Sequence, residues 1–173
     1  MLQDWNAGAR SPQEVMALVQ SGQTLFLHGA AATPRPLVEA LSERRDLQDV
    51  RIVHLHTEGS ADYADPGRER EFRAISLFTG QPVREAVTAG RADFVPIFLS
   101  DVPALLSTGI MKPDVAVLQL SPPDRHGYCT LGTSCDAARA AADTARVILA
   151  EINEQFPRTH GATAVPLAKV TAY

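Results

Sequence analysis

The sequence is poor in aromatic residues and has no excess of positive charge. Phe, Trp and Tyr make up 6% of its 173 residues, and its net charge is −4 at pH 7. Nucleic-acid-binding domains usually carry a basic face, so this balance argues against nucleic acid as the main partner. An anionic ligand would need local cations or helix N-termini rather than a global positive field.

Long apolar runs and cysteine motifs are also missing. No run approaches the roughly 20 apolar residues of a membrane-spanning helix, and residues 1–10 lack the basic and apolar regions of a signal peptide. The two cysteines, Cys129 and Cys135, are spaced as in no common zinc or redox motif. We therefore expect a cytoplasmic protein with reduced thiols, no metal and no membrane contact.

What the sequence does contain is an alternation of helical patterns and short apolar runs. Ser11, Pro12 and Glu14 make a capping box, which is typical of a helix start. Further helices are predicted over 33–45, 81–89, 101–107 and 135–144, and strands over 24–28, 50–56, 72–78, 93–97, 114–120 and 146–152, with more strand-like residues at 165–170. This order predicts an α/β fold, with an open, mostly parallel sheet and helices on both faces.

Ligands of such sheets bind beyond the carboxyl ends of the strands. The first of these segments, H-G-A-A-A-T-P at 28–34, joins a strand to a helix, and its small side chains would let a ligand approach the backbone. It matches neither the P-loop nor G-x-G-x-x-G. Tight packing between strand and helix is the competing interpretation.

Two later segments have similar settings. Residues 78–84 form another strand–turn–helix junction, in which Arg84 is a candidate for binding an anion or for a surface ion pair. The long loop 121–133 begins with S-P-P-D-R-H-G-Y and can hold a hairpin edge. Asp124 and His126 are a possible polar pair, but G-x-S-x-G is absent, so we favour a structural turn over catalysis.

His54 and His56 alternate on a predicted strand and should face the same side. A metal would need a third ligand such as Glu58 or Asp62, and we favour hydrogen-bonded histidines at a strand end instead. Glu58 is the carboxylate best suited to act as base or nucleophile, although nothing in its neighbours selects it.

Three motifs resemble the acetyl-CoA hydrolase/transferase family, which includes 4-hydroxybutyrate CoA-transferase. They are F-T-G-Q-P-V-R-E-A-V at 78–87, D-V-A-V-L-Q-L-S-P-P-D with H-G-Y-C at 114–129, and F-P-R-T-H-G at 156–161. They occur in the family's order, and the resemblance covers about 21–161. It implies an open α/β fold of the CoA-transferase type.

The resemblance implies that residues 1–173 are an N-terminal CoA-transferase domain, with the catalytic C-terminal domain outside this chain. Members move CoA between an acyl-CoA and a small carboxylic acid by means of a glutamate in the second domain. We therefore expect coenzyme A as part of the substrate, no catalytic residue here, and a C-terminal domain or partner chain in a homo-oligomer. An acyl-CoA (acetyl-CoA) hydrolase is one alternative, and a stand-alone small-molecule binding module is another of a different class.

The resemblance also assigns positions. Those implied to line the acyl pocket are Gly29, Ala30, Thr33, His54, His56, Phe78, Thr79, Gly80, Pro123, His126, Gly127 and Tyr128. Those implied at the domain junction are Arg158, Thr159, His160 and Gly161. Related sequences tend to carry glycine where this one has Ala30, Ala31 and Ala32, so the methyl groups should narrow the pocket or restrict the loop. If the second domain is missing, an apolar patch near 156–173 should be exposed or covered by a partner, whereas a stand-alone module would have a polar surface there.

Overall fold

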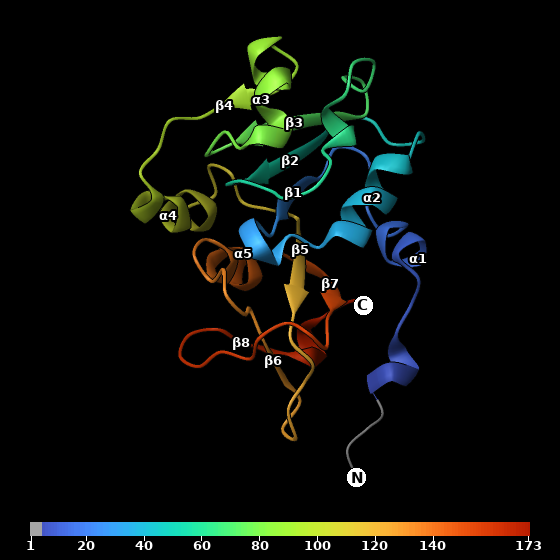
Figure 1. Ribbon diagram of the computed structural model, residues 1–173, viewed down its shortest axis with the longest axis vertical. Helices are drawn as coiled ribbons and strands as arrows, with labels where there is room; N and C mark the ends of the chain where they lie inside the picture. The colour runs from blue at the N-terminus through green and yellow to red at the C-terminus, as the bar shows by residue number, and fades with distance from the viewer. Residues whose placement is uncertain (1–4) are drawn as a thin grey trace.

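The computed structural model describes residues 5–173 and is built around a six-stranded sheet with the order β4-β3-β2-β1-β5-β7 (Figure 1). Every pair in this sheet is parallel. Its strands are β1 (Thr24–Leu27), β2 (Val50–His54), β3 (Phe72–Ser76), β4 (Asp93–Phe94), β5 (Val115–Leu120) and β7 (Val147–Ile152). The predicted parallel sheet is confirmed.

The sequence of β5 explains its central place. All six residues of V-A-V-L-Q-L are buried, as expected for a strand covered on both faces. The edge strand β4 has only two residues, both exposed. β2 ends at His54, two residues before the predicted end, and the chain then turns into the loop that forms the candidate site.

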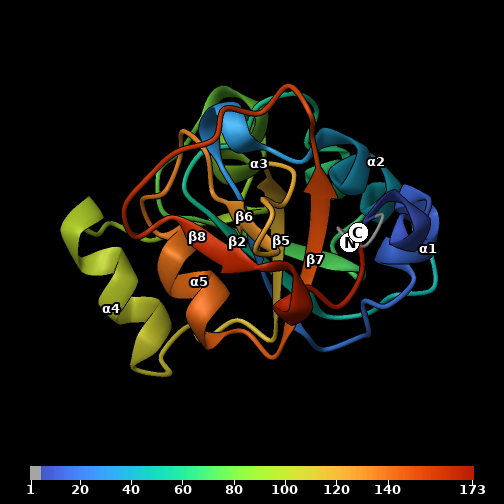
Figure 2. The ribbon, with the colours of Figure 1, turned by 90° about the horizontal axis from the view of Figure 1, so that it is seen from below.

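Within residues 5–173, five α-helices cover the two faces of the sheet. They are α1 (Pro12–Met16), α2 (Arg35–Glu43), α3 (Gln81–Thr88), α4 (Val102–Ser107) and α5 (Ala138–Thr144). Residues of α1, α2 and α3 share one buried apolar cluster, and residues of α4 and α5 share another. Figure 2 shows α1 and α2 on one side of β5 and β7, with α4 and α5 on the other. The capping box of α1 is present: the Ser11 side chain accepts from the Glu14 amide, and the Glu14 side chain accepts from the Ser11 amide.

A second, two-stranded sheet lies at the far end of the molecule, where the long loop meets the end of the chain (Figure 1). Here β6 (Tyr128–Thr130) pairs antiparallel with β8 (Ala164–Pro166). The predicted strand-like segment 165–170 is correct only at its start, because Leu167–Lys169 forms a 3-10 helix. Ala172 then forms a parallel bridge with Leu149 of β7.

The apolar surface is not where we expected it. Phe156 and Val165 are buried, and Leu167, Val170 and Tyr173 pack partly against the core. The most exposed large apolar side chains include Phe78, Phe94, Phe98, Leu99 and Ile110. The expectation of a patch at 156–173 is therefore wrong, because this segment pairs with β6 and β7 and its apolar side chains pack against the core.

Candidate functional site

A pocket of about 440 Å³ opens beyond the carboxyl ends of β2 and β3, and the loop after each strand supplies one wall. The β2 loop contributes four residues, and the β3 loop with the first turn of α3 contributes four more. The lining residues are His56, Thr57, Glu58, Gly59, Phe78, Gly80, Gln81 and Pro82. Three of them, His56, Phe78 and Gly80, belong to the predicted substrate positions.

The loop after β1 supports the β2 wall from behind. Gly29 is essential to this approach, since a Cβ there would lie 2.5 Å from the carbonyl oxygen of His56. The amide of Ala30 donates to the same carbonyl at 2.8 Å. Thr33 Oγ1 accepts from the Glu58 amide at 3.0 Å and donates to the Ala30 carbonyl at 2.8 Å. The predicted positions Gly29, Ala30 and Thr33 therefore shape the pocket through the β2 loop.

Ala30 has an unusual backbone conformation in this loop. Its φ is +50°, a left-handed conformation that costs a residue with a Cβ roughly 1–2 kcal/mol. The alanine therefore strains this loop, whereas the expected restriction of the loop stays a prediction.

An aromatic contact joins the two loops that line the pocket. The rings of His56 and Phe78 meet edge to face, with centroids 5.4 Å apart, and Phe78 is 60% exposed. Gly80 lets α3 begin close by, because a Cβ there would be 3.1 Å from the Cβ of His56. Within residues 5–173 no side chain caps the N-terminus of α3. Its first-turn amides can therefore face a carboxylate or thioester oxygen.

His54 lies below this pocket in different surroundings. It is fully buried, its Nδ1 lies 3.1 Å from the Leu55 carbonyl oxygen, and its ring is edge-on to Tyr63 at 6.3 Å. Burial lowers its pKa to about 4, so the ring is neutral at pH 7. The expected alternation fails because β2 ends at His54, and His56 follows the turn into the pocket. The described part of the chain holds no group of three or more His, Cys, Asp or Glu side chains that could bind a metal.

Residues 121–130 fold back on themselves as a projecting arm, which β6 and β8 anchor. The Asp124 carboxylate accepts from the amides of His126 and Tyr128 at 2.8 and 2.9 Å, and from Arg158 at 2.8 Å. These backbone amides, followed by the charge of Arg158, lower the pKa of Asp124. The predicted polar pair thus forms with the main chain of His126, not with its ring.

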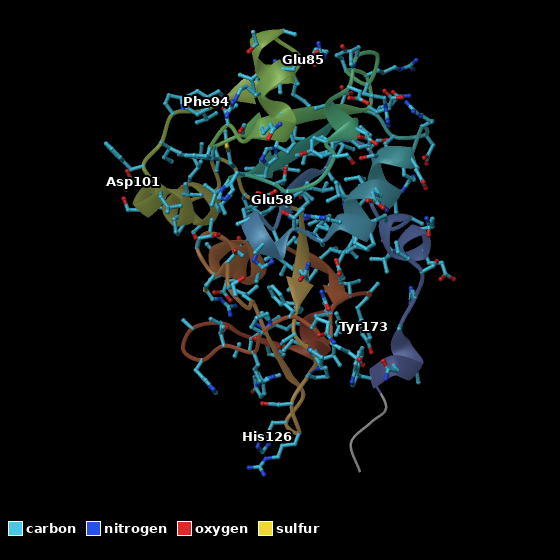
Figure 3. The ribbon with its side chains drawn as sticks, viewed as in Figure 1. Glu58, Glu85, Phe94, Asp101, His126 and Tyr173 are labelled. Atoms are coloured by element: carbon cyan, nitrogen blue, oxygen red, sulfur yellow. The ribbon has the colours of Figure 1, made fainter. Side chains whose placement is uncertain are left out.

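The arm and the pocket are separate. Figure 3 shows His126 at the tip of the arm, far from Glu58 at the pocket. The structure gathers Gly29, Ala30, Thr33, His56, Phe78 and Gly80, places Thr79 between two lining residues, and buries His54 beneath them. It does not bring the predicted arm positions Pro123, His126, Gly127 and Tyr128 to this pocket.

The four predicted junction residues lie beside the arm. Besides its ion pair with Asp124, Arg158 donates to the carbonyls of Pro122 and Tyr128 at 3.2 and 3.0 Å. Thr159 Oγ1 donates to the Gly132 carbonyl at 3.0 Å. His160 is exposed, and Gly161 has a φ of +93°. This loop locks the arm to the small sheet.

Our sequence interpretation missed a polar group at the ends of β5 and β7. Gln119 Nε2 donates to the Thr33 carbonyl at 3.2 Å, and Asn153 Nδ2 donates to Gln119 Oε1 at 3.4 Å. Glu151 pairs in register with Gln119, and burial raises its pKa. The signal was available, because Gln119 is the polar residue in an otherwise apolar run at a strand's carboxyl end.

Known proteins share both the sequence and the fold. A succinyl-CoA:acetate/propanoyl-CoA:succinate CoA transferase of Fasciola hepatica is 40% identical over 166 residues, covering 94% of this chain and 34% of the relative. A 4-hydroxybutyrate coenzyme A transferase of Clostridium kluyveri is 38% identical over 148 residues, covering 85% of this chain and 34% of the relative. The crystal structure of RipA from Yersinia pestis matches 97% of this chain and 42% of its own with a TM-score of 0.89 and 26% identity.

This chain therefore spans about a third of the length of these two curated relatives. The model of the acetyl-CoA hydrolase/transferase N-terminal domain matches residues 2–172, which is nearly the whole sequence. Together with the parallel sheet and the matching RipA fold, this match confirms the resemblance seen in the three motifs. The chain belongs to the acetyl-CoA hydrolase/transferase family, as its N-terminal domain.

Proposed function

We propose that this chain is the substrate-side domain of a CoA-transferase that moves CoA between an acyl-CoA and a small carboxylic acid. The observation that carries the proposal is the match to the family's N-terminal domain over residues 2–172. The relatives support the reaction class, since both curated proteins above are CoA transferases. In this proposal residues 1–173 are one domain, and the catalytic domain is a further part of the protein or a partner chain.

The proposed chemistry passes CoA through a glutamate of that other domain. Its carboxylate attacks the thioester carbonyl and expels CoA thiolate, which leaves an acyl-glutamyl anhydride. The thiolate then attacks the glutamyl carbonyl, forming a glutamyl-CoA thioester and releasing the first acid. The acceptor carboxylate repeats both steps in reverse order, which regenerates the glutamate and forms the new acyl-CoA.

The pocket of this chain would hold the acyl group during those steps. His56 and Phe78 offer an edge-to-face aromatic wall for the acyl chain. The uncapped first turn of α3 offers amides to a carboxylate or thioester oxygen. Glu58 lines the same pocket, and we assign it no nucleophilic role. The predicted arm and junction positions would meet the second domain rather than the acyl group.

We further propose that the second domain covers an apolar surface made of Phe78, Phe94, Phe98 and Leu99. These four side chains are 51–79% exposed. Ser76 and Phe94 are register partners on β3 and β4, so both loops that carry this surface leave the same edge of the sheet. Phe78 also lines the pocket, so a domain seated here would close it. The relatives' additional length supplies such an occupant.

The test is reconstitution. The purified 173-residue chain is mixed with the remaining two-thirds of the Clostridium kluyveri relative, and transfer from acetyl-CoA, butyryl-CoA or 4-hydroxybutyryl-CoA to a labelled acid is measured. We expect no transfer by either part alone and transfer by the mixture. Phe98→Ser should weaken reconstitution, whereas Leu18→Ser, a change at an exposed residue of another surface, should not.

Trapping then locates the covalent intermediate. After incubation with acyl-CoA, borohydride reduction and peptide mass analysis should find the modified glutamate on the second part. Modification of Glu58, or transfer by this chain alone, would overturn the proposal. Release of free CoA without transfer would favour the hydrolase, in which water is the acceptor. Tight acyl-CoA binding by this chain without any reconstitution would favour the stand-alone binding module.

A further inference from the structure

Four buried polar atoms without a hydrogen-bond partner lie together beneath the pocket. They are His54 Nε2, Thr57 Oγ1, Tyr63 Oη and Ser76 Oγ, and only Arg68 and Glu151 supply other such atoms within residues 5–173. Each of the four residues is at most 3% exposed. A buried polar atom without a partner is unfavourable, and native proteins contain few of them. Four in one place therefore require an explanation.

The contacts link these residues in a row. His54 and Ser76 are register partners on β2 and β3, so their side chains lie side by side on one face. The ring of His54 meets that of Tyr63 edge-on at 6.3 Å. Burial raises the pKa of Tyr63 to about 12, and the neighbouring Thr57 hydroxyl opposes that rise. The Thr57 and Tyr63 hydroxyls thus lie near each other without completing a hydrogen bond.

The four groups in the row differ in whether they can donate or accept a hydrogen bond. The carbonyl of Leu55 can only accept, so the Nδ1 that faces it at 3.1 Å must carry the proton. Because the ring is neutral, Nε2 is then an acceptor. The three hydroxyls can each donate and accept, yet none completes a hydrogen bond with Nε2 or with another of the three. A small ligand that both donates and accepts would satisfy all four groups.

We propose that these four groups form an internal water-binding site, in which ordered water donates to His54 Nε2 and bridges the hydroxyls of Ser76, Tyr63 and Thr57. Buried waters typically make two to four such bonds to otherwise unsatisfied groups. Thr57 also lines the pocket, so the site ties the pocket wall to β2 and β3. That positioning role rests on the proposed function of the pocket, whereas the water site does not.

The site itself is tested without any activity. A high-resolution crystal structure of this chain should show water within hydrogen-bond distance of His54 Nε2 and at least two of the hydroxyls. Nitrogen-15 NMR should show His54 protonated on Nδ1 and not on Nε2 at neutral pH. A dry cluster, a direct bond from a hydroxyl to Nε2, or the opposite tautomer would overturn the proposal.

Variants test the role of the site. Ser76→Ala and Tyr63→Phe should each remove or displace the water and speed amide hydrogen exchange at Thr57 and Glu58 about five- to tenfold, as expected for a lost buried bond. The controls Ser42→Ala and Tyr173→Phe remove hydroxyls that bond Val38 and Trp5 directly, and should leave exchange at the pocket unchanged. Equal effects in variants and controls would overturn the positioning role.

In the reconstituted enzyme, Tyr63→Phe should change KM more than kcat. A failure of reconstitution would count against the proposed function, while the crystallographic and NMR results decide the water site.

Discussion

The pocket and the arm both follow strands of the main sheet, but they differ in whether their polar groups have hydrogen-bond partners within the protein. In the arm, Asp124 accepts from two main-chain amides of its own loop, and Arg158 of the neighbouring loop donates to two of the arm's carbonyls. Around the pocket, the amides of α3 have no side-chain cap among the described residues, and the polar atoms below lack partners. The arm's polar groups are thus satisfied by the protein itself, whereas the pocket leaves groups available to a ligand.

The largest expected effect of a single substitution is at Gly132, just beyond the arm. Gly132 has a φ of +59°, and a Cβ there would overlap the ring of buried Phe156. Gly132→Ala should therefore lower the free energy of unfolding by about 4 kcal/mol, from overpacking together with left-handed strain. Urea denaturation measures the loss.

Gly127→Ala is the matched control for that change. Gly127, at the arm's tip, also has a positive φ, but a Cβ added there would meet no atom within 4 Å. Only the conformational part remains, so we expect a loss of about 1 kcal/mol. Equal losses at the two glycines would contradict the packing argument.

The next largest effect is the loss of stability in acid, which we expect from the histidine below the pocket and not from the arm. Because His54 has a pKa of about 4 when folded and 6.5 as its ordinary value, the unfolded chain binds more protons between those two pH values. The contribution of neutral His54 to the free energy of unfolding is therefore fully present above pH 6.5. It is lost as the pH falls to 4, which lowers the free energy of unfolding by on the order of 3 kcal/mol. Burial lowers the pKa of His28 as well, which acts in the same direction.

The arm should keep its stabilising bonds between pH 6.5 and 4, because the pKa of Asp124 lies below its usual 3.8. The contribution of the Asp124 carboxylate to the free energy of unfolding is lost only at lower pH. Urea denaturation of the His54→Gln variant between pH 7.5 and 4.5 should show a flatter dependence than the wild type. An unaltered slope in His54→Gln would show that another group is responsible.

A smaller effect is expected where the two pocket loops meet. Gly29 has a φ of −109°, so alanine is not strained there, but its Cβ would lie 2.5 Å from the His56 carbonyl oxygen. Gly29→Ala should cost about 2 kcal/mol by overpacking and shift the amide resonances of the β2 loop. Gly90→Ala, with open space around it, should leave those resonances in place; if both variants shift them alike, the close approach is not the cause.

The smallest effect has the opposite sign. Ala30→Gly removes the left-handed strain of the loop but adds flexibility to the unfolded chain, so the two terms partly cancel. We expect a net gain of about 0.5 kcal/mol in thermal or urea denaturation. The neighbouring Ala32, fully buried and without a positive φ, provides the control, because its change to glycine should destabilise. A loss in Ala30→Gly would mean that its backbone is not strained.

Local pattern was sufficient to predict much of this protein. The capping box at Ser11 and Glu14 and the buried run of β5 depend on neighbouring residues, so the α/β fold and its parallel sheet followed from the chain alone. The motifs were likewise contiguous and identified the family. The same pattern put the pocket loops at strand ends, because parallel strands deliver them to one edge.

Tertiary structure decided which of those loops meet. The approach of Gly29 to His56 and the bonds from Arg158 to the arm join residues far apart in the sequence. Strand order and the pairing of β6 with β8 bring the pocket loops together and hold the arm away from them. Those pairings also bury the end of the chain and leave the apolar surface at Phe94 and Phe98. A periodic pattern records which side of an element is buried, but the partner that buries it is chosen by packing across the whole fold.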